Sequence, residues 1–532
     1  MPRNPSGRDG NVRSPSGSND GVASGVPNVP LPRHVRVEIA GAGFSGLCMA
    51  IALKARGIED FAVLERGPDV GGTWRVNTYP GCQCDVPSYL YSFSFAPKPD
   101  WSRLYSMQGE ILQYLRDCAD RHGVRPRIHF DCEVLSARWN EREAQWHVAT
   151  SSGLLTADVL VAATGALSEP SLPSIPGMET FHGRSFHSAA WPDRCELSGE
   201  RVAVIGTGAS AIQFVPKIQP VVSCLSVFQR TPPWILPQWD SEIPGSLIEL
   251  FGRFPWIQKA LRDGLYWGLE GGVLLAHLPV AKAMTWVARA HLRRETPNPV
   301  LRAKVIPRYT LGCKRVLVSN TWYSTLAQPN VELVTDEIRE IGERSVTSKD
   351  GTVREIDTLI FATGFRATDP PLSRNVTGRD GLLLEAAWRD GMTAYRGTTV
   401  PGFPNFFVLV GPNTRPVHTS LTIMIEAQVE YVLSCLRHMD VSELATIEVR
   451  DDALRAFNEE VQTKLAATVW SRGGCSSWYL DAQGRNTTLW PGFTWRFRRL
   501  ARRFDVDAYR VRRRADRWAG AAHDARAREW SA

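Results

Sequence analysis

Apolar stretches that run into glycine-rich turns begin two segments of the chain. The stretch His34 to Ala40 precedes one such turn, and an apolar stretch of helical length, Leu47 to Ala55, follows it. The same order returns at Val202 to Ile205. An apolar strand, a glycine turn and a helix are the opening of a parallel α/β unit. The pattern therefore predicts an α/β protein with two such units.

The remaining pattern predicts further elements and an internal repeat. We expect a strand at Phe61 to Leu64, a helix from Glu110 to His122 and a long helix from about Leu421 to His438. The segment Asp158-Val-Leu-Val-Ala-Ala-Thr-Gly165 matches Asp357-Thr-Leu-Ile-Phe-Ala-Thr-Gly364, and each reads as a buried strand that enters a turn of small residues. Each copy also lies downstream of a glycine turn. This order predicts two Rossmann-like dinucleotide-binding domains, one inserted into the other.

The expected divisions follow from changes in composition along the chain. They are a disordered leader at 1–32, the first part of a discontinuous domain at 33–168, an inserted domain at 169–345 with a helical insertion at about 244–300, the second part of the discontinuous domain at 346–495, and an Arg-rich tail at 496–532. The helical insertion is rich in aromatic residues, namely Phe251, Phe254, Trp256, Tyr266, Trp267 and Trp286. We interpret these as core or as the wall of a pocket for a bulky apolar substrate.

Composition and charge exclude several classes of protein. Hydrophobic residues make up 43% of the 532 residues and charged residues 22%, which excludes disorder of the chain as a whole. The net charge of +7 comes from the segment Arg496 to Trp530, with twelve Arg and five acidic residues, so the rest of the chain is neutral. A chain-wide basic surface is therefore excluded, and no nucleic-acid partner is expected. No membrane span and no signal peptide are apparent.

The ten cysteines show neither a CxxC pair nor the spacing of a zinc site, so no metal site is predicted. Without a signal peptide, they are interpreted as reduced thiols of a cytoplasmic protein. Cys82 and Cys84, separated by one residue, leave a thiol–disulfide pair as an alternative, although a disulfide at that spacing would be strained.

The first glycine motif is Gly41-Ala-Gly43-Phe-Ser-Gly46, and Glu65 stands 19 residues after it at the end of the next strand. In such a motif the glycines permit a tight turn, close approach of the backbone to a pyrophosphate and close packing of helix on strand, while the acid binds a ribose diol. A second glycine-rich loop, Gly71-Gly72-Thr73-Trp74, follows shortly after. The residues predicted to bind the first dinucleotide are Gly41, Gly43, Ser45, Gly46, Glu65, Gly72, Thr73 and Trp74.

The second glycine motif is Gly206-Thr-Gly208-Ala-Ser-Ala211, and Arg230 stands where the first motif has Glu65. Gly41 to Glu65 and Gly206 to Arg230 are both 24 positions. An arginine attracts a 2′-phosphate that an acid would repel, so this site is predicted to bind NADPH. Its predicted residues are Gly206, Thr207, Gly208, Ser210, Gln213, Arg230 and Thr231. A hydride donor beside a second dinucleotide, with no metal site, indicates FAD as the partner cofactor.

Between the two motifs lies the pattern Phe181-His-Gly183-Arg-Ser-Phe-His187-Ser-Ala-Ala-Trp191-Pro192. It resembles the fingerprint of type I Baeyer–Villiger monooxygenases, whose N-hydroxylating and S-oxidising relatives usually lack the final Trp. The resemblance extends over about residues 34–495, through Tyr79-Pro-Gly-Cys-Gln-Cys-Asp85, Gly312-Cys-Lys314-Arg315, Gly411-Pro-Asn413 and Gly474-Cys-Ser-Ser-Trp478.

The resemblance implies an enzyme that uses FAD, NADPH and dioxygen to convert a ketone into an ester or lactone. It implies Arg315 and Asp85 as catalytic residues, and Gln83, Cys84, Asp85, Tyr91, Lys314 and Trp478 as cofactor contacts. Gln83 stands where the family often has an arginine, so a contact to NADPH is expected to differ. The alternative function is a flavin-dependent monooxygenase that hydroxylates nitrogen or oxidises sulfur. A third possibility is a flavoprotein whose basic tail binds nucleic acid, but the intact glycine motifs argue against it.

Overall fold

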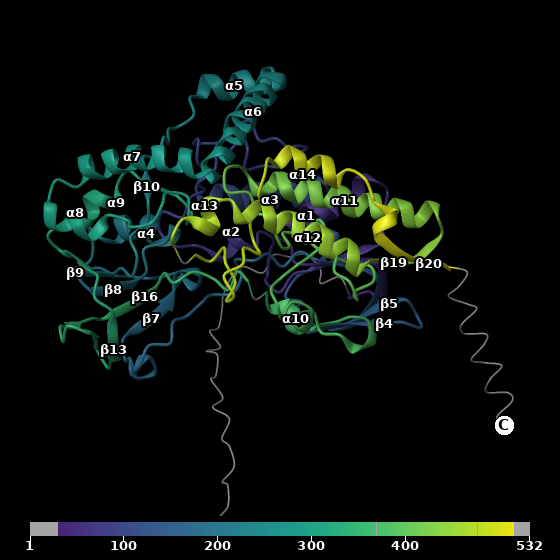
Figure 1. Cartoon of the computed structure of the whole chain (residues 1–532), viewed down its shortest axis with the longest axis horizontal. Coiled ribbons are helices and arrows are strands. Elements are labelled where there is room, and N and C mark those ends of the chain that lie inside the picture. Colours follow the sequence, from purple (N-terminus) through teal and green to yellow (C-terminus); the bar gives the residue numbers. More distant parts are fainter. Residues whose placement is uncertain (1–29, 369, 476, 515–532) are drawn as a thin grey trace, which may run out of the picture. The chain divides into compact units, whose positions relative to one another are not determined.

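Residues 30–368, 370–475 and 477–514 are described by a computed structural model, shown in Figure 1. Most of the predicted leader and the end of the predicted tail lie outside these ranges. The larger of two main sheets has eight strands in the order β17-β4-β5-β6-β1-β2-β3, with β18 also paired to β6. Its strands are β1 His34–Ala40, β2 Phe61–Leu64, β3 Ile128–His129, β4 Val134–Asn140, β5 Gln145–Thr150, β6 Gly153–Ala162, β17 Val376–Thr377 and β18 Phe406–Val408.

The centre of this sheet is parallel and buried. Val37 of β1 pairs with Phe61 of β2 on one side and with Val159 of β6 on the other, and all three are buried. A strand that is paired on both edges and covered by helices is buried on both faces. Such a strand has a nearly continuous apolar sequence, as seen here. The predicted strands at His34–Ala40 and Phe61–Leu64 are confirmed.

Helices pack on this sheet and on one another. Helix α1 packs against α3 and α11, and α11 packs against α14. The helices are α1 Phe44–Ala55, α2 Thr73–Val76, α3 Gln108–Arg121, α10 Leu384–Ala387, α11 Leu421–Val441, α12 Asp451–Ala466, α13 Val469–Arg472 and α14 Thr494–Ala501. Helix α11 is mostly apolar, is capped by the Ser420 side chain, and lies buried along most of its length. It confirms the predicted long helix.

The predicted Arg-rich tail is folded in its described part, which corrects the expectation of a tail from residue 496. Helix α14 buries Phe497, and strand β20, Tyr509–Arg513, pairs antiparallel with β19, Leu444–Val449. Arg496, Arg498 and Arg499 lie on the exposed face of α14. On α14 the arginines therefore form a solvated helix face, while the apolar positions between them pack on the core.

The second main sheet has five parallel strands in the order β12-β9-β8-β16-β7. They are β7 Arg184–His187, β8 Arg201–Ile205, β9 Cys224–Phe228, β12 Val331–Val334 and β16 Thr358–Phe361, with helices α4 Ala209–Ile218 and α9 Trp322–Leu326. Two smaller sheets accompany it: β13 Ile338–Gly342, β14 Ser345–Ser348 and β15 Val353–Glu355 in one, and β10 Ile235–Leu236 with β11 Leu317–Val318 in the other. Each main sheet thus has parallel central strands and contains a strand, glycine turn and helix, which confirms the predicted fold class.

The chain enters the second sheet from the first and returns to it, as predicted for an inserted domain. Strand β16 belongs to the second sheet, because Leu359 pairs with Ala203 of β8. The predicted boundary at 345 is therefore too early, and the chain returns to the first sheet only at β17. The two crossings run side by side: Ser171 donates its N–H to Gly364 O (2.9 Å), and Arg366 donates its N–H to Glu169 O (3.0 Å).

The helical insertion comprises α5 Gly245–Arg253, α6 Pro255–Glu270, α7 Leu278–Glu295 and α8 Pro299–Val305, drawn in teal in Figure 1. Of its six aromatic residues, Phe251 and Tyr266 are buried, whereas Trp256, Trp267 and Trp286 are 67%, 61% and 72% exposed. Among the described residues no single helix is long and apolar enough to cross a membrane; the bent pair Pro255–Leu274 and Pro279–Glu295 meets that test by length and composition only.

Candidate active site

Both glycine turns open onto one cavity of about 710 Å³. Sixteen of the predicted residues line it: Gly41, Gly43, Ser45, Glu65, Gly72, Thr73, Trp74, Gln83, Cys84, Asp85, Tyr91, Gly208, Ser210, Gln213, Arg315 and Trp478. Gly46, Gly206, Thr207, Arg230, Thr231 and Lys314 are not part of its wall. The six aromatic residues of the helical insertion are absent from the wall as well, so the predicted aromatic pocket wall is not found there.

The first turn has the geometry that a dinucleotide phosphate requires. Gly41 adopts φ = 107°, which favours glycine, and a Cβ on Gly46 would lie 1.8 Å from Gly41 O. These two glycines therefore serve the turn and the packing of α1 on β1. A Cβ on Gly43 would meet only the Gly72 backbone, at 3.6 Å, so this glycine keeps open the space in front of the α1 N-terminus, where phosphate binds in such folds.

Glu65 lies buried behind the first turn, with each carboxylate oxygen held by the backbone. Its Oε2 accepts a hydrogen bond from Ala42 N (2.8 Å), and its Oε1 accepts one from Gly67 N (2.9 Å). An ionised carboxylate has about four acceptor positions, so capacity remains for the hydroxyl groups of a ribose. The residues present fit the adenosine end of FAD.

The second turn repeats this geometry. Gly206 adopts φ = 113°, and a Cβ there would lie 2.4 Å from Ala362 O, whereas a Cβ on Gly208 would meet nothing within 4 Å. Beyond the cavity wall, the pKa of Lys314 is lowered by burial and by the positive charge of Arg230. The charge of Arg230 therefore acts on the Lys314 ammonium. Two positive charges near the second turn fit NADPH, which carries one more phosphate than NADH.

Arg315 and Asp85 meet at the cavity wall from segments 230 residues apart. Arg315 donates to Asp85 Oδ2 from both Nε (2.8 Å) and Nη2 (2.6 Å), and each side chain is about a third exposed. The Asp85 carboxylate raises the pKa of Arg315 further above its usual range. The guanidinium is therefore a permanent cation whose orientation is fixed by two hydrogen bonds.

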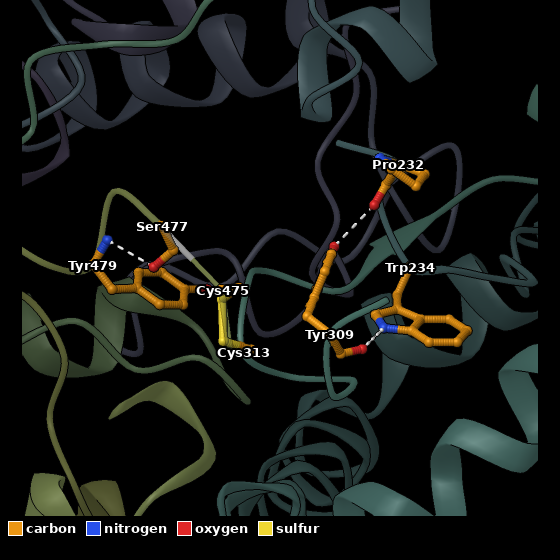
Figure 2. Close-up of a disulfide and its surroundings, with 7 residues drawn as sticks. All are labelled: Pro232, Trp234, Tyr309, Cys313, Cys475, Ser477 and Tyr479. Atoms are coloured by element: carbon orange, nitrogen blue, oxygen red, sulfur yellow. Dashed lines mark hydrogen bonds between the residues drawn. A yellow bond between two sulfur atoms is a disulfide. The ribbon is translucent and has the colours of Figure 1, made fainter. Parts of the chain in front are cut away.

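A disulfide joins the segment before Arg315 to the loop that carries Trp478 and Tyr479. Cys313 and Cys475 are bonded, although they are 162 positions apart in the sequence (Figure 2). The expectation that all ten cysteines are reduced is therefore wrong for this pair, which only the fold brings together. Cys82 and Cys84 are both free.

The fingerprint segment connects the second sheet to the first. Trp191 packs on Phe214 of α4 (ring centroids 5.2 Å apart), and Phe214 packs on Tyr79 (5.9 Å). Tyr79 in turn donates its hydroxyl hydrogen to Gln213 Oε1 at 3.0 Å. Gln213 also donates from Nε2 to Gln83 O at 2.9 Å. The segment thus holds α4 against the loop that ends in Asp85.

Among the cavity residues that sequence reasoning missed, three buried polar side chains bear on the chemistry of the site. Arg415, Thr419 and Tyr479 line the cavity and are buried. Arg415 has a visible signal, because it is the first charged residue after the charge-free run from Gly397 to Thr414. Tyr479 follows the predicted Trp478 directly. Among the described residues, no group of three or more His, Cys, Asp or Glu side chains could hold a metal ion.

Comparisons with known proteins agree with this geometry. A family model described as pyridine nucleotide-disulphide oxidoreductase matches residues 39–234. A Baeyer-Villiger monooxygenase of Streptomyces coelicolor is 48% identical over 492 residues, which cover 92% of this chain and 95% of that protein. A Baeyer-Villiger monooxygenase of Pseudomonas aeruginosa is 47% identical over 91% of this chain and 93% of that protein.

Solved structures give the same picture. Cyclohexanone monooxygenase from Rhodococcus sp. Phi1, bound to NADP+, superposes with a TM-score of 0.81 at 28% identity and covers 91% of this chain and 100% of its own. OTEMO in complex with FAD and NADP superposes with a TM-score of 0.82, also at 28% identity, over 90% of this chain and 99% of its own.

Proposed function

The chain belongs to the Baeyer–Villiger monooxygenase family. We propose that the enzyme inserts one oxygen atom of dioxygen into a ketone bound in this cavity. In this proposal Arg315 is the catalytic arginine and Asp85 is its partner. The observation that carries this proposal is the position of the Arg315–Asp85 pair: it lines the same cavity as both glycine turns. The product is an ester, or a lactone where the ketone is cyclic. Because the reaction consumes NADPH, we expect the enzyme in the cytoplasm.

The two cofactors have separate binding surfaces on this chain. The turn of Gly41 and Gly43 with Glu65 binds FAD, and the turn of Gly206 and Gly208 with Arg230 binds NADPH. FAD bound there would supply the redox chemistry: NADPH would be oxidised and dioxygen consumed, with one oxygen atom entering the ketone and the other leaving as water. The chain supplies position and charge to this chemistry.

Arg315 contributes a fixed positive charge where negative charge develops on the carbonyl oxygen of the ketone. A cation in a cavity poor in water interacts far more strongly with such a charge than it would in bulk water. Its guanidinium needs little reorganisation, because Asp85 already holds it through Nε and Nη2. Nη1 takes no part in this pair and is left to donate to the substrate.

Asp85 has two roles toward Arg315. It orients the guanidinium fork, and it balances the positive charge when no anion is present. Because it accepts from Arg315 through one oxygen, Oδ2, its second oxygen is not used in that pair. Asp85 therefore acts through Arg315, as a positioning residue.

The test compares flavin reduction with product formation in Arg315→Ala. The wild-type holoenzyme is given NADPH and a panel of cyclic, aromatic and terpenoid ketones, and the product mass is measured. We expect Arg315→Ala to bind both cofactors and to be reduced by NADPH, but to lose ester formation by at least about a hundredfold, as when one donor to a developing oxyanion is removed. Arg315→Lys should recover only part, because an ammonium lacks the planar fork.

The matched control is Arg308→Ala, which removes an exposed arginine from the same stretch of chain. It should leave ester formation unchanged. Ester formation by Arg315→Ala at near the wild-type rate would remove Arg315 from the mechanism. Oxidation of sulfides or amines by an enzyme that converts no ketone of the panel would favour the nitrogen- or sulfur-oxidising alternative.

A further inference from the structure

Four arginines line the cavity, and within the described residues one of them lacks an acidic partner. The paired ones are Arg66 with Glu169 (2.9 Å), Arg75 with Glu65 (3.4 Å) and Arg315 with Asp85 (2.6 Å). Arg415 forms no ion pair with any described residue. A buried guanidinium is costly unless an anion or several hydrogen-bond acceptors compensate it.

Arg415 is buried and held in place. It is 8% exposed, and its Nη1 is buried without a hydrogen-bond partner among the described residues. Its backbone is fixed on both sides, since Arg415 N donates to Thr488 O (3.1 Å) and Trp490 N donates to Arg415 O (3.0 Å). Burial lowers its pKa to about 10, so the side chain still carries its charge at neutral pH.

The surroundings of Arg415 place it at the reacting end of the cavity, which is the end that holds Arg315 and Asp85. Its guanidinium lies over the Trp478 ring, 5.3 Å from the centroid. The neighbouring Tyr479 lies within electrostatic reach of both Arg415 and Arg315. Both positive charges therefore act on Tyr479, but only Arg315 has a carboxylate beside it.

Two hydroxyl groups in the same wall also lack partners among the described residues. They are Tyr479 Oη and Thr419 Oγ1, both buried. Together with Arg415 Nη1, they are three of the four buried donors of the wall that lack an acceptor among the described residues; the fourth, Arg75 Nε, belongs to a guanidinium that already pairs with Glu65. A carboxylate offers about four acceptor positions and one negative charge, which matches this set.

The anionic groups of the two cofactors are accounted for elsewhere. The pyrophosphates belong at the two glycine turns, and the 2′-phosphate belongs beside Arg230 and Lys314. Neither oxidised flavin nor nicotinamide brings a negative charge to the reacting end. We propose that Arg415 binds the carboxylate of the substrate, so that the enzyme acts on ketones that carry a carboxylate group. This inference rests on the proposed function and deepens it.

Binding is the direct test, because it does not require turnover. The probes are 4-oxocyclohexanecarboxylate and its methyl ester, which share the ketone ring and differ in one charge. Each is titrated by calorimetry into the holoenzyme with NADP+ bound. We expect the wild-type enzyme to bind the acid at least about tenfold more tightly than the ester, as one charge-assisted contact to a buried partner provides.

Three variants separate the explanations. Arg415→Gln should abolish the preference for the acid while binding of the ester changes little, and Arg415→Lys should keep part of the preference. Arg472→Gln, which removes an exposed arginine outside the cavity wall, should keep all of it. Salt should weaken binding of the acid in the wild-type enzyme only modestly, because the site is buried.

The proposal is wrong if the wild-type enzyme binds the acid no more tightly than the ester, or if Arg415→Gln weakens both probes equally. A variant that keeps the preference but lowers the flavin reduction potential would show that Arg415 serves the reduced cofactor instead. Failure of the proposed function looks different: no ketone of any charge would then yield an ester or lactone.

Discussion

Arg230 and Lys314 bring two positive charges together at the edge of the second nucleotide site. Arg230 is exposed just beyond the end of β9, whereas Lys314 is partly buried over the Tyr309 ring, 5.4 Å from its centroid. Neither forms an ion pair with another described residue. Neighbouring cations repel each other unless an anion lies between them, and the 2′-phosphate is the anion that distinguishes NADPH from NADH.

Arg230→Ala should therefore raise the Michaelis constant for NADPH and leave that for NADH nearly unchanged. A charge-assisted hydrogen bond is worth about 1.5–3 kcal/mol, which corresponds to roughly a ten- to hundredfold weaker interaction. Steady-state kinetics with both coenzymes provides the measurement. Lys217→Ala removes an exposed cation from α4 and serves as the control. Equal losses with NADPH and NADH would show that Arg230 has a structural role.

The turn between β1 and α1 contains two glycines that are required for different reasons. At Gly46 an added Cβ would overlap Gly41 O, at 1.8 Å, so the requirement comes from the packing of the polypeptide itself. At Gly43 the nearest atom is Gly72 Cα, at an ordinary 3.6 Å, so the polypeptide tolerates a Cβ there. The requirement at Gly43 comes from the ligand, because a side chain would occupy the space of the pyrophosphate.

Substitution at the two glycines should accordingly separate cofactor binding from folding. Gly43→Val is expected to give a folded, colourless protein whose FAD content is strongly reduced, since the branched side chain fills the phosphate space. Gly46→Ala is expected to be insoluble or to unfold at a much lower temperature. Flavin absorbance per protein and thermal unfolding are the two measurements. Normal flavin content in folded Gly43→Val would contradict the placement of the first cofactor.

Elements and site residues were predictable where the signal is local. The strands before both glycine turns, and the residues of the turns, follow from patterns of a few positions. Strand β16 lies beyond the predicted boundary at 345, and only its pairing with β8 decides which sheet it joins. Cys313 and Cys475 are 162 positions apart, so no spacing rule suggests their disulfide. Arg415 follows the predicted segment Gly411-Pro-Asn413 closely. That it has no acidic partner among the described residues is visible only in the folded cavity, so the sequence does not reveal it.

The two sheets are connected by more than the paired crossings at 169–171 and 364–366. Gln213 of α4 is the polar link, since its amide joins the hydroxyl of Tyr79 and the carbonyl of Gln83, both in the loop that leads to Asp85. The same loop contributes the partner of Arg315. A change at Gln213 therefore alters how the second nucleotide site is positioned against the catalytic pair, without removing a charged group.

Gln213→Leu should retain FAD and still be reduced by NADPH, but it should consume more NADPH per ester formed and release the difference as hydrogen peroxide. The physical reason is position: a displacement of about 1 Å at a reacting centre can cost about a hundredfold in rate, whereas the two glycine turns, Glu65 and Arg230 are unchanged in this variant. The measurement compares NADPH oxidised, ester formed and peroxide released on one ketone substrate. Gln219→Leu is the matched control, because Gln219 ends the same helix yet bonds to Asn330 inside the second domain, at 2.7 Å. Equal uncoupling in both variants would show that the effect comes from α4 stability and not from the contact between the two domains.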